Sequence, residues 1–356
     1  MLMDQRRPTQ TPPPKPGPPK RGPIIPGQTK SDPLNPGLAD FLPRRDKLFT
    51  RTPPVIFLAV LGLMGLGLAL RQAVQILGLN PAPVDGFLGA TMGLWGFALV
   101  ALLAKILRRP SSVMDDLRVL PGRLGYPAAA MSGMAAAMIL LPYAPQTALG
   151  LLWVALAAQT VLAILLARTL WRLPAEARMI SPVWHFGFTG FALAILPLAQ
   201  LGWTTTAQVL LICLLPIAAL ILATGLVQIL RGRPSAQLRP LLALHLTPFA
   251  LFAQAAQMTG ADNLAMLLAV LGLVLFAALI LTLPWLTRSG FAPLWLCFAY
   301  PLTAFAQSLL TLGDPWSTFG LALTGLALVL VPVLVWKMLR LWPGGKLAAK
   351  TNAAIA

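Results

Sequence analysis

The chain has 356 residues, of which 57% are hydrophobic and only 10% are charged. Soluble domains contain about 25% charged residues, so this composition excludes an ordinary soluble domain. The net charge of +17 would suit a nucleic-acid partner. The basic residues lie in the N-terminal region and in alternate short loops, however, which is typical of a membrane protein and argues against nucleic acid.

Residues 1–52 are rich in proline and in basic residues, as in Pro12-Pro13-Pro14. Such a segment buries too little apolar surface to offset the loss of chain entropy, so we predict a disordered cytoplasmic tail. No apolar stretch follows the first charges, which argues against a signal peptide. Within the tail, Leu38 to Phe49 mix apolar and basic residues. They either lie on the anionic membrane surface or form a plain basic linker.

After the tail, residues 53–342 alternate between long apolar stretches and short polar connections. A helix of about 20 apolar residues crosses the hydrocarbon core, and ten stretches reach this length. The predicted spans are 54–76, 84–107, 120–142, 147–171, 182–202, 207–230, 239–259, 264–286, 291–312 and 316–341. Turns such as Gly78-Leu79-Asn80-Pro81 favour tight helical hairpins. We therefore predict an all-α integral membrane domain, followed by a short cytoplasmic tail at 343–356.

The charges predict an orientation. All but one of the 27 Lys and Arg residues lie in the N-terminal tail, in every second connection or in the C-terminal region. The exception is Arg71, near the outer end of the first span, which either attracts anions or reaches to the lipid headgroups. The opposite connections carry Asp85, Asp262 and Asp314. Because cytoplasmic loops are enriched in Lys and Arg, both termini should be cytoplasmic and the spans should lie in the inner (plasma) membrane.

Three odd-numbered spans carry a proline within or near their cytoplasmic half: Pro127, Pro248 and Pro301. Proline removes a helical hydrogen bond, so we predict kinks at these positions. In a membrane the freed carbonyl needs a partner from protein or pore water, which favours an interior position for the odd-numbered spans. Prolines in even-numbered spans, Pro216 and Pro332, weaken this argument.

Small residues predict further contacts. Glycines in the first two spans favour close helix packing; they are Gly62, Gly65, Gly67, Gly89, Gly93 and Gly96. Cys213 and Cys297 both lie inside apolar spans, where we expect buried residues and no disulfide.

The ninth span carries the most specific motif. Trp295-Leu296-Cys297-Phe298-Ala299-Tyr300-Pro301 resembles the Trp-x-x-Phe-x-Phe-Pro segment of the tellurite-resistance/dicarboxylate transporter family. That family includes TehA, the malic acid transporters and the slow-type anion channels of guard cells. Other segments that resemble the family are Leu283-Pro284-Trp285, Tyr126-Pro127 and Ser181-Pro182-Val183-Trp184. The similarity covers roughly residues 53–342.

The resemblance implies five helical hairpins around a central pore, lined by the odd-numbered helices, in an assembly that is usually a homotrimer. In the family, a phenylalanine just before the ninth-span proline or glycine plugs the pore. Tyr300 stands at this position and is the predicted pore gate. Gly187 and Val60 stand where family members often have proline, which implies softer or absent hinges in the fifth and first spans.

Tyr300, Thr303 and Gln307 form one stripe of the ninth helix, at positions i, i+3 and i+7. Two interpretations are open: these residues line the pore, or their polar groups bond neighbouring helices. Further pore-lining candidates are His245, Phe249 and Phe298.

The chain has two histidines, His185 and His245, and both lie within predicted spans. A histidine inside a membrane is a functional candidate, and a protonated one would attract anions. Without neighbouring cysteines or carboxylates the pair makes a poor metal or haem site. We therefore favour hydrogen bonding between helices and predict no cofactor.

No Asp or Glu lies in the middle of a predicted span. Proton- and sodium-coupled carriers commonly use such a carboxylate, so its absence favours a channel or uniporter for small anions, either inorganic anions or small dicarboxylates. The sequence contains no catalytic constellation, and we do not expect an enzyme. Two alternatives remain open: a ten-span drug/metabolite carrier built of two inverted halves, and a membrane anchor subunit of a redox complex.

Overall fold

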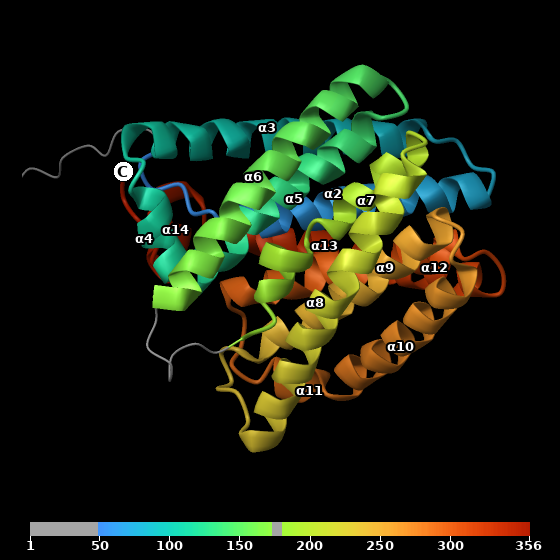
Figure 1. Ribbon diagram of the computed structural model, residues 1–356. Coiled ribbons are helices and arrows are strands. Elements are labelled where there is room, and N and C mark those ends of the chain that lie inside the picture. The colour runs from blue at the N-terminus through green and yellow to red at the C-terminus, as the bar shows by residue number, and fades with distance from the viewer. Residues whose placement is uncertain (1–48, 173–179) are drawn as a thin grey trace, which may run out of the picture. The chain divides into compact units, whose positions relative to one another are not determined.

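The computed structural model describes residues 49–172 and 180–356 (Figure 1). The chain from Lys47 to Ala356 forms one compact unit, and its described part is helical, without strands. Most of the predicted tail, and the patch from Leu38 up to residue 48, lie outside the described residues. The last residues of that tail, 49–52, form a turn in which the Thr52 hydroxyl donates to the Phe49 carbonyl.

The helices follow the predicted spans closely. The long ones are α2 (Ile56–Ile76), α3 (Ala82–Arg108), α5 (Leu120–Leu140), α6 (Pro145–Arg172), α7 (Ala192–Gln200), α8 (Thr204–Arg231), α9 (Leu246–Met258), α10 (Asp262–Leu281), α12 (Ala299–Thr311) and α13 (Trp316–Leu339). Three of them begin with a differently wound turn: η2 (His185–Thr189, a π-helix) before α7, and the 3₁₀-helices η3 (Arg239–His245) and η4 (Pro293–Phe298) before α9 and α12. The short helices are α4 (Ser112–Arg118), α11 (Leu283–Leu286), η5 (Pro343–Gly345) and α14 (Lys346–Lys350).

Eight helices of the described chain are long and apolar enough to cross a membrane. They are α2, α3, α6, α8, α10, α13 and the continuous segments η3–α9 and η4–α12. The other two predicted spans correspond to α5, which is rich in alanine and glycine, and to the shorter apolar segment His185–Gln200. The count of ten spans therefore stays a prediction.

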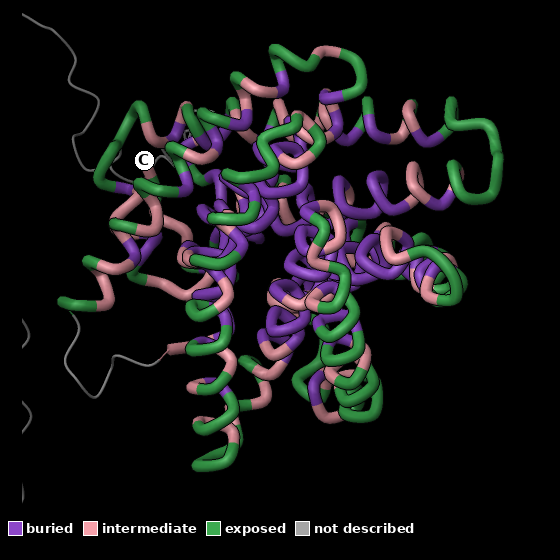
Figure 2. Tube along the Cα trace, turned by 45° about the vertical axis from the view of Figure 1, so that its right-hand side comes forward, coloured by how far each residue is buried: buried purple, intermediate pink, exposed green. Residues whose placement is uncertain are grey.

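Burial divides the long helices into two sets (Figure 2). In α2, α9 and α12, 78% of the residues in the apolar window are buried, against 22–28% in α3, α6, α8, α10 and α13. Most residues of α5 and α7 are buried as well. We call α2, α5, α7, α9 and α12 the inner helices and the remaining five the outer helices. The outer helices expose large apolar side chains, as expected of surfaces that face lipid.

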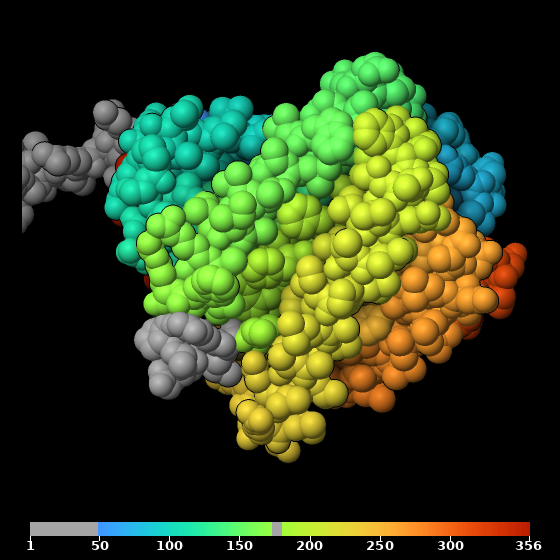
Figure 3. Space-filling model, viewed as in Figure 1, coloured from blue at the N-terminus to red at the C-terminus, as the bar shows by residue number. Residues whose placement is uncertain are grey.

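Each inner helix contacts two others in a closed order, α2–α5–α7–α9–α12 and back to α2. Each outer helix packs on the inner helix before it in the chain: α3 on α2, α6 on α5, α8 on α7, α10 on α9 and α13 on α12. In the view of Figure 3, α6, α8 and α10 run side by side over one face of this unit. The odd-numbered predicted spans are thus the interior ones.

Glycines of α2 allow a close approach between the backbones of α2 and α12. A Cβ added at Gly62 would lie 2.8 Å from the Ala299 Cβ, and one at Gly65 would collide with Thr303. The predicted close packing is therefore confirmed in α2. It is wrong in α3 for Gly89, Gly93 and Gly96, where an added Cβ would meet no atom of the described chain within 4 Å. No other helix of the described residues covers the face of α3 on which these three glycines lie.

The two cysteines differ in environment. Cys297 is buried, as predicted, but Cys213 is exposed on the outer helix α8. The prediction of burial was wrong for Cys213 because an apolar stretch alone does not show whether a residue faces protein or lipid.

A buried ion pair joins α3 to α4 at the end of the bundle that carries the basic loops. The Lys105 ammonium lies 2.7 Å from the Asp116 carboxylate, and neither side chain is exposed. The same carboxylate accepts hydrogen bonds from the Tyr126 hydroxyl, at 3.1 Å, and from the backbone N–H of Ala354, at 2.6 Å. The C-terminal segment after α14 is therefore fixed against α4 and α5.

Candidate functional site

Tyr300, the predicted gate, is the second residue of α12 and is only 3% exposed. Its ring lies beside α2, where a Cβ added at Gly65 would be 3.2 Å from the Tyr300 Cδ2. On another side, the Phe186 ring of η2 stands edge-on to it, with the ring centroids 6.1 Å apart. Because η2 and α12 are not neighbours in the order of inner helices, these two rings meet across the interior of the unit.

The Tyr300 hydroxyl is the group that distinguishes this residue from phenylalanine. Among the described residues, none forms a hydrogen bond with it. Within the described chain, the hydroxyl is therefore not bonded to a neighbouring backbone group.

Thr303 forms a hydrogen bond within α12, whereas Gln307 joins α12 to α2. The Thr303 hydroxyl donates to the Tyr300 carbonyl at 3.0 Å, and the Gln307 amide donates to the Gly65 carbonyl at 3.0 Å. Gln254 of α9 makes a similar bond to the Ala304 carbonyl at 2.9 Å. Polar bonding between helices is therefore present for Gln307 and Gln254, while the bond of Thr303 lies within α12. A pore-lining role of Thr303 and Gln307 stays a prediction.

The π-helical turn η2 positions Phe186 and contains Gly187. A π-turn leaves backbone carbonyls without their usual helical partners. The buried side chain of Gln159, on the outer helix α6, donates to the carbonyls of Phe186 and Gly187 at 2.7 and 2.9 Å. The sequence reasoning missed both Phe186 and Gln159. A single glutamine within an otherwise apolar span was the available signal for Gln159.

The two histidines lie next to each other. The His185 Nε2 and His245 Nδ1 atoms are 2.9 Å apart, and both residues are buried. This confirms the predicted hydrogen bonding between helices for both histidines; that they bond to each other was not predicted. The other ring nitrogen of His245 has no hydrogen-bond partner among residues 49–172 and 180–356, and it faces Gly225 of α8, where an added Cβ would lie 2.8 Å from it. No group of three metal-ligating residues occurs in the described chain.

The remaining candidates lie toward the outer helices. The Phe249 Cβ would be 3.3 Å from a Cβ added at Gly272 of α10, and Phe298 borders a groove between α10 and α13. Their pore-lining roles, and that of His245, stay predictions.

Two of the predicted kinks coincide with a change of helix type. The 3₁₀ turn η3 gives way to α9 three residues before Pro248, and η4 gives way to α12 three residues before Pro301. A proline fits in the first turn of the new helix, where its missing N–H would have no helical partner. Pro127 lies inside α5. The kinks themselves stay predictions.

Charge is distributed unevenly along the unit. The inner helices, with η2, η3 and η4, contain no carboxylate. At one end, Arg71 is paired with Asp85 of α3 at 3.1 Å and also donates to the Ile139 carbonyl, so its charge is matched by an acid. At the other end, a cavity of about 740 Å³ between α5, α8 and η3 is bordered by Arg123, Arg231 and Arg233.

A comparison with known proteins identifies a family that this chain matches. The family model SLAC1, described as voltage-dependent anion channel, matches residues 51–340. This range nearly coincides with the predicted transmembrane domain, and the family includes relatives of TehA and of the malic acid transporters. A search of curated proteins found no match to the chain.

Proposed function

Since the chain belongs to the SLAC1 family of voltage-dependent anion channels, and is thus a multi-pass membrane protein of an anion-conducting family, we propose that small anions pass between its inner helices and that Tyr300 closes this path. The substrates we propose are inorganic anions or small dicarboxylates.

The contact between Phe186 and Tyr300 carries the proposal. The two rings come from helices that do not adjoin, and their centroids are 6.1 Å apart, so together they occupy the space that the inner helices surround. A path along the axis of these helices must pass this pair. Tyr300 is buried away from the lipid-facing surface, which is a requirement for any gate.

The distribution of charge supports anions as the solute. A carboxylate along the path would repel anions, and the inner helices have none. The arginines around the cavity at one end raise the local concentration of anions, and rings of basic residues favour anion entry.

The proposed architecture follows the resemblance and the charge pattern. Ten spans form five hairpins, with both termini in the cytoplasm, in the inner (plasma) membrane. The contacts of each outer helix with the inner helix before it support the hairpins. In the proposed assembly, three chains form a homotrimer and each chain has its own anion path.

Anion flux tests the gate. The protein, reconstituted in vesicles, is compared with Tyr300→Ala by chloride flux and by current recording. Removing the ring opens the narrowest point, so we expect at least a tenfold increase, which corresponds to a barrier lowered by about 1.4 kcal/mol. Phe319→Ala is the matched control, since Phe319 lies exposed on α13 and its loss should leave flux unchanged.

Flux that stays at the level of empty vesicles in both wild type and Tyr300→Ala would refute the channel. A channel and a uniporter are separated by unitary currents, because only a continuous path gives resolvable single openings. A drug/metabolite carrier would transport uncharged or cationic solutes in the same vesicles, and a redox anchor subunit would show no flux.

A further inference from the structure

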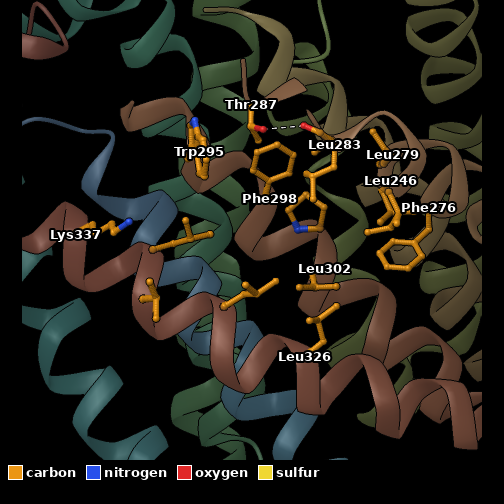
Figure 4. Close-up of a pocket in the computed structure, with 16 residues that line it drawn as sticks. Leu246, Phe276, Leu279, Leu283, Thr287, Trp295, Phe298, Leu302, Leu326 and Lys337 are labelled. Carbon is orange, nitrogen blue, oxygen red and sulfur yellow. Dashed lines mark hydrogen bonds between the residues drawn. The ribbon is translucent and has the colours of Figure 1, made fainter. Parts of the chain in front are cut away.

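A groove opens on the lipid-facing side between the outer helices α10 and α13, with a volume of about 330 Å³ (Figure 4). Its floor is the inner helix at Phe298, Pro301 and Leu302. Phe276 and Leu326, from α10 and α13, are among its walls. The groove therefore reaches Pro301, the residue that directly follows Tyr300.

The groove is polar only at one end. Apart from the indole of Trp295, the polar side chains that border it are Thr287 and Lys337. The Thr287 hydroxyl already donates to the Leu283 carbonyl at 2.8 Å. Lys337 is exposed and lies 5.3 Å above the Phe291 ring, with no carboxylate among the described residues paired to it. Lys337 is therefore a cation without a paired carboxylate among the described residues, at one end of an otherwise apolar groove.

The length of the groove matches half a bilayer. Along α13 it extends from Leu326 to Lys337, which is about 16 Å at the helical rise of 1.5 Å per residue. The hydrocarbon core is about 30 Å thick, so the groove spans one leaflet. An acyl chain lying in it would place its headgroup beside Lys337, near the level where the basic loops begin.

A second lipid-facing groove has no basic residue at its border, unlike the groove between α10 and α13. Between α3 and α6 lies a cavity of about 630 Å³ on the lipid-facing side, bordered by residues such as Leu103 and Val161. None of the residues that border it is Lys or Arg. Lipid chains can fill both grooves, but only the groove between α10 and α13 offers a charge to the headgroup.

We propose that the groove between α10 and α13 binds one acidic phospholipid, with an acyl chain against Pro301 and Leu302 and the phosphate beside Lys337. An ammonium pairs with a phosphate as a point charge. The effect on the gate rests on the proposed function: a chain packed behind Pro301 restricts the movement of Tyr300 and so changes anion flux.

Photolabelling tests the site directly. The protein is placed in phosphatidylcholine vesicles that contain traces of phosphatidylglycerol or phosphatidylcholine with a diazirine in the acyl chain, and labelled peptides are identified by mass spectrometry. We expect phosphatidylglycerol to label residues 326–334 at least threefold more than phosphatidylcholine. Lys337→Gln should abolish this preference, and Leu330→Trp should fill the groove and remove most of the labelling.

Leu103→Trp is the matched control, because Leu103 and Leu330 are similarly exposed, at 46% and 43%, and border different grooves. It should leave the labelling of residues 326–334 intact. Equal labelling by the two lipids in wild type, or labelling that survives Leu330→Trp, overturns the proposal. Inorganic phosphate added to the vesicles should not reduce the labelling; competition by phosphate would show a free-anion site and overturn the lipid as its occupant.

Anion flux in vesicles with and without phosphatidylglycerol separates the two proposals. If both hold, wild-type flux depends on phosphatidylglycerol and Lys337→Gln loses this dependence. Selective labelling without flux in any vesicle refutes the channel and leaves the lipid site standing. Flux with no selective labelling refutes the lipid site alone.

Discussion

At the scale of single residues, Asp116 joins α3, α5 and the C-terminal segment at the basic end of the unit. Its carboxylate accepts bonds from Lys105, Tyr126 and Ala354, while Lys105 also donates to the Thr52 carbonyl at 3.1 Å. A buried ion pair costs desolvation energy, and it is tolerated only where further hydrogen bonds satisfy both groups. The contacts of Asp116 meet this condition.

We predict that Asp116→Ala lowers the thermal stability of the purified protein sharply. The substitution leaves the Lys105 ammonium buried without its counter-charge, which costs about 3–5 kcal/mol. The unfolding midpoint in detergent measures this loss. Asp115→Ala is the control, because Asp115 pairs with exposed Arg109 and Arg118 and surface pairs contribute about 0–1 kcal/mol. Equal midpoints for the two variants would contradict the prediction.

Some residue contacts could be predicted from the sequence and others could not. Both histidines were assigned to hydrogen bonds because each lacked acidic or thiol neighbours, but the sequence did not reveal that they bind each other. The sequence did not identify Gln159 and Phe186 as site residues, because their partners come from other helices. Helical periodicity shows which residues share a face; it does not show what that face meets.

At the scale of helices, the contact between α2 and α12 places the gate. Gly62 and Gly65 allow the backbone of α2 to approach Ala299 and Thr303, and Gln307 bonds across the same interface. The position of Tyr300 therefore depends on the absence of side chains on this face of α2.

Gly62→Ala should destabilise the protein, because its new Cβ would lie 2.8 Å from the Ala299 Cβ and overpacking costs about 1–3 kcal/mol. Gly325→Ala on α13 is the matched control: its Cβ meets nothing within 4 Å, and alanine favours a helix over glycine by up to about 1 kcal/mol. The unfolding midpoint should fall in the first variant and hold or rise in the second. A midpoint for Gly62→Ala at or above that of Gly325→Ala would show that α12 adjusts freely.

The sequence predicted helix positions to within a few residues, since apolar length is the dominant signal in a membrane. It did not predict the π-turn η2 or the 3₁₀ turns η3 and η4, which have no distinctive local pattern. The glycines of α3 misled the packing prediction, because a small residue permits a contact without requiring one.

At the scale of the whole molecule, the inner helices are surrounded by outer helices that expose leucine, isoleucine and valine (Figure 2). The general function could be predicted from the sequence, because the ninth-span motif is specific and the family match spans the same residues. Of the aromatic pair at the proposed gate, only Tyr300 could be identified from the sequence, since Tyr300 lies in the motif and Phe186 does not.

Cysteine accessibility tests the ten-span topology. In a background with Cys213→Ser, single cysteines replace the exposed residues Ser111, Gln146, Thr205 and Ser235. A membrane-impermeant thiol reagent applied outside should label Gln146→Cys and Thr205→Cys only. Ser111→Cys and Ser235→Cys should react after permeabilisation. Ser111 and Gln146 lie on either side of α5, so the same side for these two would show that α5 does not cross. Gln146 and Thr205 lie on either side of α6 and the segment His185–Gln200. Because α6 is long and apolar enough to cross, opposite sides for Gln146 and Thr205 would show that His185–Gln200 does not.

The order of inner and outer helices along the chain has a consequence for biogenesis. The segments with the weakest membrane-spanning character, α5 and His185–Gln200, are each followed directly by a strongly apolar helix, α6 or α8. During synthesis the weaker segment leaves the ribosome first, and its partner follows within a few residues. We therefore expect the insertion machinery to admit these helices as pairs, so that the polar and small residues of the interior never depend on their own affinity for lipid.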